Sequence, residues 1–155
     1  MSETTPFSFQ EPGRLVDGDL ELVLVETTPG NVVRGWAPVY RFEMRSCGVP
    51  LAMGEIDLRI GNSENIVRYF GHIGYGVLPA FRGRRYAARS CRLLFDLARA
   101  HGLDRLWITC NPENRASRRT CMLIGGRLID TVELPKTHEL YLRGDRYKCR
   151  YRIDL

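Results

Sequence analysis

Three arginines stand at a point in the chain where a strand-like pattern gives way to a helical one. Alternating apolar residues and glycines are followed by Arg82-Gly83-Arg84-Arg85 and then by an amphipathic helix. The free amides of a helix's first turn and the positive end of its dipole attract anions. Arginine adds hydrogen bonds to phosphate oxygens. The segment therefore predicts a pyrophosphate-binding loop, and the alternative interpretation is an exposed basic turn.

The strand before this loop carries glycines where side chains are usual. We expect a strand over residues 67–78, with His72, Gly74 and Gly76 on the face opposite Tyr75 and Val77. Glycine weakens a strand, so Gly74 and Gly76 indicate either a bulge or the close approach of another backbone or a ligand.

The remaining pattern predicts the elements that position this segment. Strands are expected over residues 20–25, 40–45, 55–60, 106–110, 128–134 and 147–155, and helices over residues 86–101 and from 114 to 125. Residues 1–19 are expected to cover the surface loosely, and residues 27–35 to form a turn. The order ββββαβαββ predicts one α/β domain over residues 1–155, with a mixed sheet.

The composition narrows the class of protein. The chain has 155 residues, of which 44% are hydrophobic and 26% charged, typical of a globular domain. No apolar run is long enough to span a bilayer, and residues 1–10 lack a signal-peptide pattern. Five cysteines, an odd number without metal-ligand spacing, predict a reducing, cytoplasmic location and no metal site. The net charge of +5 suits a phosphate-bearing partner, either a nucleotide cofactor or nucleic acid, or is a solvated basic surface.

The arginine-rich loop resembles the best-known motif of the GNAT acetyltransferase superfamily, Gln/Arg-x-x-Gly-x-Gly/Ala. Arg82 and Ala87 match this motif, whereas Arg85 stands where the family has glycine. A second family pattern, in which a small residue and then a glycine follow an asparagine, is matched by Asn114, Ser117 and Gly125. Residues 71–126 and 150–155 are similar to a bacterial branch usually described as predicted acetyltransferases.

This resemblance implies a GNAT-like single domain whose mostly antiparallel central sheet has splayed fourth and fifth strands. Family members insert two helices between the first and second strands, and these cover the acceptor. Residues 26–35 fill that interval here, so the helix pair is expected to be shortened or absent. The acceptor cleft is then open, or is completed by residues before Leu20 or by a second subunit of a homodimer.

The activity that the resemblance implies is N-acetyl transfer, by direct attack, from acetyl-CoA to a primary amine of an unidentified small molecule or peptide. The pantetheine arm is expected along Tyr75, Gly76 and Val77, and Asn114 and Ser117 are expected beside the arm. The residues expected to hold the pyrophosphate are Arg82, Gly83, Arg84, Arg85, Tyr86 and Ala87.

Three side chains are candidates for the proton transfers. His72 matches the position of the family's usual base, and its ordinary pKa of about 6.5 suits that role; the alternative is a half-buried histidine with a backbone partner. Glu55 is a second candidate base, or a solvated glutamate on a strand face. Cys121 stands where many members place a tyrosine acid, and it is a candidate acid or inert packing.

Two competing functions stay open. A non-catalytic acyl-CoA-binding sensor or regulatory module is favoured by the missing tyrosine and motif glycine. Nucleic-acid binding would use the arginines of the last strand together with Arg82 to Arg85. Tyr147 and Tyr151 lie on the face opposite the charges of that strand, which leaves no stacking platform. No membrane partner is expected.

Overall fold

The computed structural model describes residues 7–155, so residues 1–6 of the segment expected to cover the surface lie outside the described part. Two antiparallel sheets form the fold, one of five strands in the order β1-β2-β3-β4-β5 and one of three in the order β6-β8-β7. The strands are β1 (Leu15–Asp17), β2 (Leu20–Thr28), β3 (Val39–Ser46), β4 (Gly54–Arg59), β5 (Ile73–Val77), β6 (Arg105–Cys110), β7 (Arg127–Glu133) and β8 (Tyr147–Asp154). The helical segments are η1 (Asn65–Phe70), η2 (Pro79–Phe81), α1 (Tyr86–Leu93), α2 (Phe95–Ala100), α3 (Arg115–Leu123) and α4 (Glu139–Leu142).

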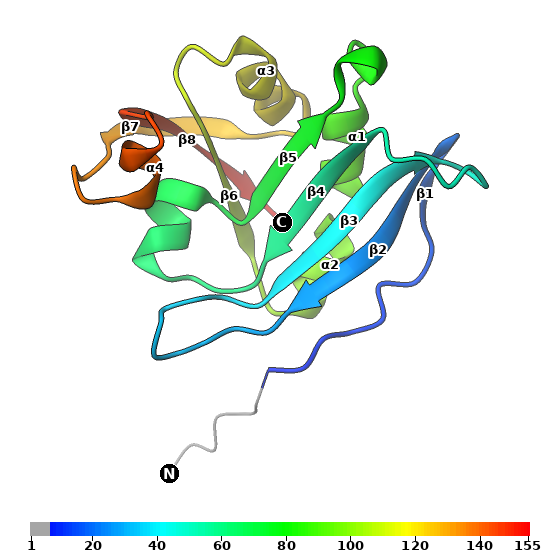
Figure 1. Cartoon of the computed structure of the whole chain (residues 1–155), viewed down its shortest axis with the longest axis horizontal. Coiled ribbons are helices and arrows are strands. Elements are labelled where there is room, and N and C mark those ends of the chain that lie inside the picture. The colour runs from blue at the N-terminus through cyan, green and yellow to red at the C-terminus, as the bar shows by residue number, and fades with distance from the viewer. Residues whose placement is uncertain (1–6) are drawn as a thin grey trace.

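The five-stranded sheet has one buried and one open face, because apolar and polar residues alternate along its strands. Phe42, Met44 and Leu58 are fully buried in the core, which also contains residues of α1 and α2. In Figure 1 both helices lie behind the sheet. The opposite face carries charged side chains such as Glu43 and Glu55, which lie directly across from each other on β3 and β4. This open face borders β5.

The two sheets meet at one end of β5 and then separate. The amide of His72 donates a hydrogen bond of 2.7 Å to the carbonyl of Trp107 in β6. Beyond that point β5 and β6 form no ladder with each other, and each is the edge strand of its own sheet. The expected splay of the fourth and fifth predicted strands is thus confirmed, as is the α/β fold class.

The strand predicted over residues 67–78 is wrong in its first half. Residues Asn65–Phe70 form a short π-helical segment, and β5 begins only at Ile73. Gly71 ends this segment with φ of 74° and ψ of 169°, a backbone conformation that is essentially restricted to glycine. A Cβ atom at this position would lie 2.8 Å from the Trp107 carbonyl oxygen, so glycine also permits the close approach of β6.

Other differences from the predicted elements are small. The helix predicted over residues 86–101 is interrupted at Leu94, which separates α1 from α2. Part of the supposedly loose N-terminal segment forms β1, which pairs with β2. The short α4 was not predicted, and the His138 side chain caps it by accepting a hydrogen bond from the Leu140 amide.

The interval between β2 and β3 contains no helix. This agrees with the expectation that the family's helix pair at this position is shortened or absent. Residues 29–38 form a turn closed by two backbone hydrogen bonds of 2.9 Å between Asn31 and Trp36. Across residues 7–155, no helix is both long enough and apolar enough to cross a membrane.

Candidate functional site

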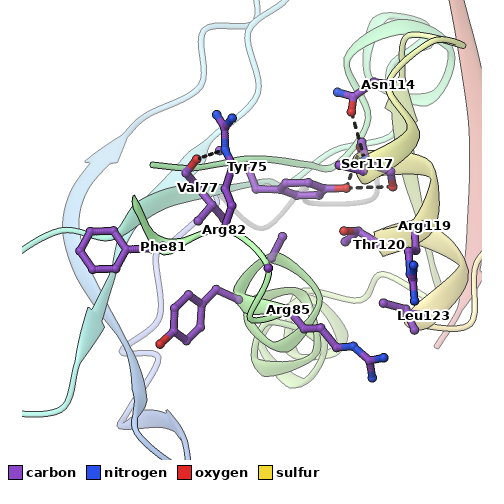
Figure 2. Close-up of a pocket in the computed structure, with 15 residues that line it drawn as sticks. Tyr75, Val77, Phe81, Arg82, Arg85, Asn114, Ser117, Arg119, Thr120 and Leu123 are labelled. Carbon is purple, nitrogen blue, oxygen red and sulfur yellow. Dashed lines mark hydrogen bonds between the residues drawn. The ribbon is translucent and has the colours of Figure 1, made fainter. Parts of the chain in front are cut away.

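A cavity of about 740 Å³ lies where the end of β5, the start of α1 and one face of α3 converge. Figure 2 shows its lining side chains, which come from two separate stretches of the sequence, residues 75–87 and 114–123. The lining residues are Tyr75, Gly76, Val77, Phe81, Arg82, Gly83, Arg85, Tyr86, Ala87, Asn114, Ala116, Ser117, Arg119, Thr120 and Leu123. All but one of the residues predicted to bind a cofactor are therefore brought together in one cavity.

The start of α1 supplies unpaired backbone donors to this cavity. The first hydrogen bond of the helix runs from the Arg89 amide to the Arg85 carbonyl, so the amides of residues 85–88 have no acceptor within the helix. Gly83, with φ of 85°, bends the loop ahead of the helix, and no described atom lies within 4 Å of where its Cβ would be. The loop thus presents amides and a positive helix end to an anion.

The three arginines of the motif occupy different environments. Arg82 lines the cavity, and its Nε donates a hydrogen bond of 2.9 Å to the Val77 carbonyl. Arg84 is the predicted contact that does not line the cavity. It lies near Asp19, where a hydrogen bond from Arg89 lowers the pKa of that carboxyl and the charge of Arg84 lowers it further.

The free edge of β5 faces the gap between the sheets. The Leu78 amide donates to the Met53 carbonyl, and the Arg59 amide donates to the His72 carbonyl. Because consecutive residues of a strand direct their backbone groups to opposite edges, those of Tyr75 and Val77 face away from β4. Apart from the Val77 carbonyl, which binds Arg82, these groups suit hydrogen bonding to an extended ligand.

A hydroxyl bridge connects β5 to α3 at the bottom of the cavity. The Tyr75 hydroxyl lies 2.8 Å from Ser117 Oγ and 3.3 Å from the Ser117 carbonyl oxygen (Figure 2). Asn114 caps α3 by accepting a hydrogen bond of 3.1 Å from the Ser117 amide. Burial strongly raises the pKa of Tyr75, so its hydroxyl stays protonated and keeps its O–H for hydrogen bonding, here with Ser117.

His72 lies outside the cavity, at the point where the sheets meet. Its side chain is 0% exposed, and Nδ1 accepts a hydrogen bond of 2.9 Å from the Trp107 amide. Nε2 must therefore carry the proton, and it donates to the Gly61 carbonyl at 2.8 Å. Burial lowers the pKa of this imidazole. The arrangement matches the alternative of a buried histidine with backbone partners.

Glu55 lies on the other side of β5. It lines a second cavity, of about 330 Å³, which shares Gly76, Val77 and Arg82 with the first. Its register partner is Gly76, which has no side chain to cover it. Glu55 is exposed, and no ion pair joins it to another residue in the described part of the chain. A carboxylate thus borders the place where the two cavities meet.

Cys121 is fully buried in α3 and does not line the cavity. A hydrogen bond between its thiol and that of Cys110 raises the pKa of Cys121 and lowers that of Cys110. Tyr75 and Ser117 line the cavity, whereas both thiols are buried. The geometry therefore agrees with the packing alternative for Cys121.

Sequence reasoning missed part of the α3 face. Ala116, Arg119, Thr120 and Leu123 line the cavity beside the predicted Asn114 and Ser117. Their spacing of three and four residues is that of one helix face, so extending the helical period beyond Ser117 would have found them.

A family model described as acetyltransferase (GNAT) domain matches residues 21–127. No curated protein sequence matches the chain.

Several solved structures share this fold. RimL, a ribosomal L7/L12 α-N-protein acetyltransferase in complex with coenzyme A, has a TM-score of 0.66 at 16% identity, covering 92% of this chain and 98% of its own. A probable acetyltransferase (GNAT family) from Chromobacterium violaceum has a TM-score of 0.65 at 14% identity, and the match covers 99% of this chain and 96% of that one. The microcin C7 self-immunity acetyltransferase MccE, in complex with acetyl-CoA and AMP, has a TM-score of 0.57 at 17% identity, covering 76% of this chain. The chain spans only 61% of the length of MccE.

Proposed function

The chain belongs to the acetyltransferase (GNAT) family, and from this premise we propose that it transfers the acetyl group of acetyl-CoA to a primary amine of a small molecule or peptide. The observation that carries the proposal is the single cavity that joins the free edge of β5, the start of α1 and the polar face of α3. Related structures hold acetyl-CoA or coenzyme A on the same fold. Acetyl-CoA supplies an activated acyl group that an amine attacks directly.

The residues present suit this co-substrate. The amides of residues 85–88, with Arg82 close by, suit the pyrophosphate. The backbone groups of Tyr75 and Val77 suit the amides of the pantetheine arm, and Gly76 leaves space beside it. The side chains of Asn114 and Ser117 border the same path. Arg84 does not line the cavity and is left out of this assignment.

Glu55 is our choice for the general base. An amine is protonated at neutral pH and must lose a proton before it attacks the thioester. Glu55 is exposed on the open sheet face, across from Gly76, and it lines the second cavity, which shares Gly76, Val77 and Arg82 with the first. It accepts the ammonium proton directly or through one water molecule. His72 has both ring nitrogens engaged by backbone groups, so we assign it to holding the two sheets together.

The Tyr75 hydroxyl assists the departure of the thiolate. Many family members use a tyrosine of the helix after the fifth strand, where this chain has Cys121. Tyr75 extends from β5 to the same helix and lines the cavity. Its raised pKa keeps it protonated, so it is not the source of the proton; it donates a hydrogen bond to sulfur by turning its O–H from Ser117 towards the thiolate. The net reaction converts an ammonium ion and acetyl-CoA into an acetamide, the free thiol of CoA and one proton released to water.

The test is an acetyl-transfer assay with acetyl-CoA and a panel of amines, including polyamines, amino acids and peptides with free N-termini. Mass spectrometry of the products avoids thiol reagents, with which the exposed Cys47 would react. We expect acetylation of at least one amine. Glu55→Gln should lower kcat by about 10²-fold or more while acetyl-CoA still binds.

The control is Glu21→Gln, which removes the same charge from β2 at a position outside both cavities. Tight acetyl-CoA binding without transfer to any amine would contradict the proposal and favour a non-catalytic acyl-CoA-binding module. An unchanged kcat in Glu55→Gln would refute its role as the base.

A further inference from the structure

The cavity contains two arginines that the pyrophosphate assignment does not use. Arg85 and Arg119 line it from different elements, the loop before α1 and the middle of α3. Neither forms a hydrogen bond or an ion pair through its side chain with any of residues 7–155, unlike Arg82, which binds the Val77 carbonyl. Figure 2 shows Arg85 extending from the start of α1 towards the α3 side of the cavity, where Arg119 lies.

Arg85 is held in an unfavourable backbone conformation. With φ of 60° and ψ of 26°, it is the one non-glycine residue of the described chain that has a positive φ. Glycine would adopt this conformation without the steric cost that a side chain brings. The side chain is exposed, so packing does not compensate for the cost.

One charged group of the proposed co-substrate has not yet been given a binding partner in the protein. CoA carries a pyrophosphate and, separately, a 3′-phosphate monoester on its ribose. The amides at the start of α1 suit the pyrophosphate, whereas Arg85 directs its guanidinium away from those amides and towards α3. A dianionic phosphate monoester between two elements is well matched by one guanidinium group from each.

We propose that Arg85 and Arg119 together bind the ribose 3′-phosphate of CoA and select CoA over dephospho-CoA. This inference rests on the proposed function, because it requires the cofactor to lie in this cavity. The arginine that replaces the motif glycine then gains a contact that glycine could not make.

Isothermal titration calorimetry with CoA and dephospho-CoA tests the proposal. We expect the unmodified protein to bind CoA about 10-fold to 100-fold more tightly than dephospho-CoA, as charge-assisted hydrogen bonds to one phosphate require. Arg85→Gly and Arg119→Ala should each reduce that preference to a few-fold, with the affinity for dephospho-CoA little changed. Arg115→Ala, which removes an arginine of α3 outside the cavity, should keep the full preference.

Thermal unfolding without ligand separates binding from folding. Arg85→Gly should unfold at or above the temperature of the unmodified protein, because the left-handed conformation costs glycine less. Equal affinities of the unmodified protein for CoA and dephospho-CoA would overturn this proposal and leave the proposed function standing. A preference that survives both substitutions would overturn the assignment to these arginines. Failure of both ligands to bind the folded protein would overturn the proposed function as well.

Discussion

At the scale of single residues, the environment of each side chain decides between the roles that its chemistry allows. His72 and Glu55 both have the chemistry of a base. His72 is enclosed by backbone groups of Gly61 and Trp107, whereas Glu55 is exposed beside a glycine. A base must reach the substrate, so accessibility favours Glu55.

The role of His72 in joining the sheets predicts a pH dependence of stability. Burial lowers its pKa in the folded protein below the ordinary value of about 6.5, so the unfolded chain binds the proton more tightly. The stabilisation is therefore complete above about pH 6.5 and is lost as the pH falls towards the folded-state pKa. Denaturant unfolding between pH 7.5 and 5 should show stability falling by up to about 1.4 kcal/mol per pH unit.

His72→Gln should remove most of this slope. His101 and His138 also have pKa values lowered by burial, so a smaller slope should remain. His138→Gln, at a partly exposed site, serves as the matched control and should keep most of the dependence. A slope that is equally steep in His72→Gln and in the unmodified protein would show that His72 does not couple protonation to folding.

At the scale of elements, the splay depends on how the segment before β5 is tied to β6. The short helical segment over residues 65–70 turns at Gly71, and the following residue then bonds to Trp107 in both directions. Further along β5, the next connection is the Tyr75–Ser117 bridge to α3. The cavity begins at the second connection and extends from there along the end of β5 to the start of α1 and the face of α3.

Gly71→Ala should therefore destabilise the protein by about 2–4 kcal/mol, because a side chain meets both a forbidden backbone conformation and the Trp107 carbonyl. Gly102→Ala is the matched control. That glycine also has a positive φ, of 82°, but its Cβ would meet no described atom within 4 Å. Gly102→Ala should therefore lower the free energy of unfolding by only about 1 kcal/mol. Denaturant unfolding measures both losses of stability. Similar losses in the two variants would show that the contact between Gly71 and the Trp107 carbonyl of β6 does not limit the side chain at position 71.

At the scale of the whole molecule, the cavity bridges the two sheets. α1 packs with the five-stranded sheet and α3 with β6, so a ligand held by both helices joins the two halves. In residues 7–155, no helix inserted between β2 and β3 covers the open charged face of the larger sheet.

Binding of acetyl-CoA should consequently stabilise both halves together. At a free concentration 100-fold above its Kd, the free energy of unfolding should rise by about 2.7 kcal/mol. Hydrogen exchange should slow in core strands of both sheets to a similar degree. Slower exchange confined to α1 would show that the ligand does not engage α3 and would contradict the bridging geometry.

Much of this molecule was readable from local patterns. The alternation of apolar and polar residues predicted the strands of the larger sheet, since side chains of one strand alternate between its faces. The arginine-glycine loop before a helix predicted an anion site, because the donors belong to neighbouring residues of one segment. Asn114 and Ser117 were indicated by the resemblance to the family pattern, and in the structure Asn114 caps α3 through the Ser117 amide.

The rest depended on contacts between distant segments. The helical segment over residues 65–70 is favoured by the approach of Gly71 to β6, which no local pattern reveals. The sequence likewise left His72 and Glu55 as alternative candidate bases and Cys121 as a candidate acid, because each has suitable chemistry. Burial of His72 between Gly61 and Trp107, and exposure of Glu55 opposite Gly76, are properties of the packed chain. The types of chemistry available were thus set by the residues, and access to the substrate was set by the tertiary structure.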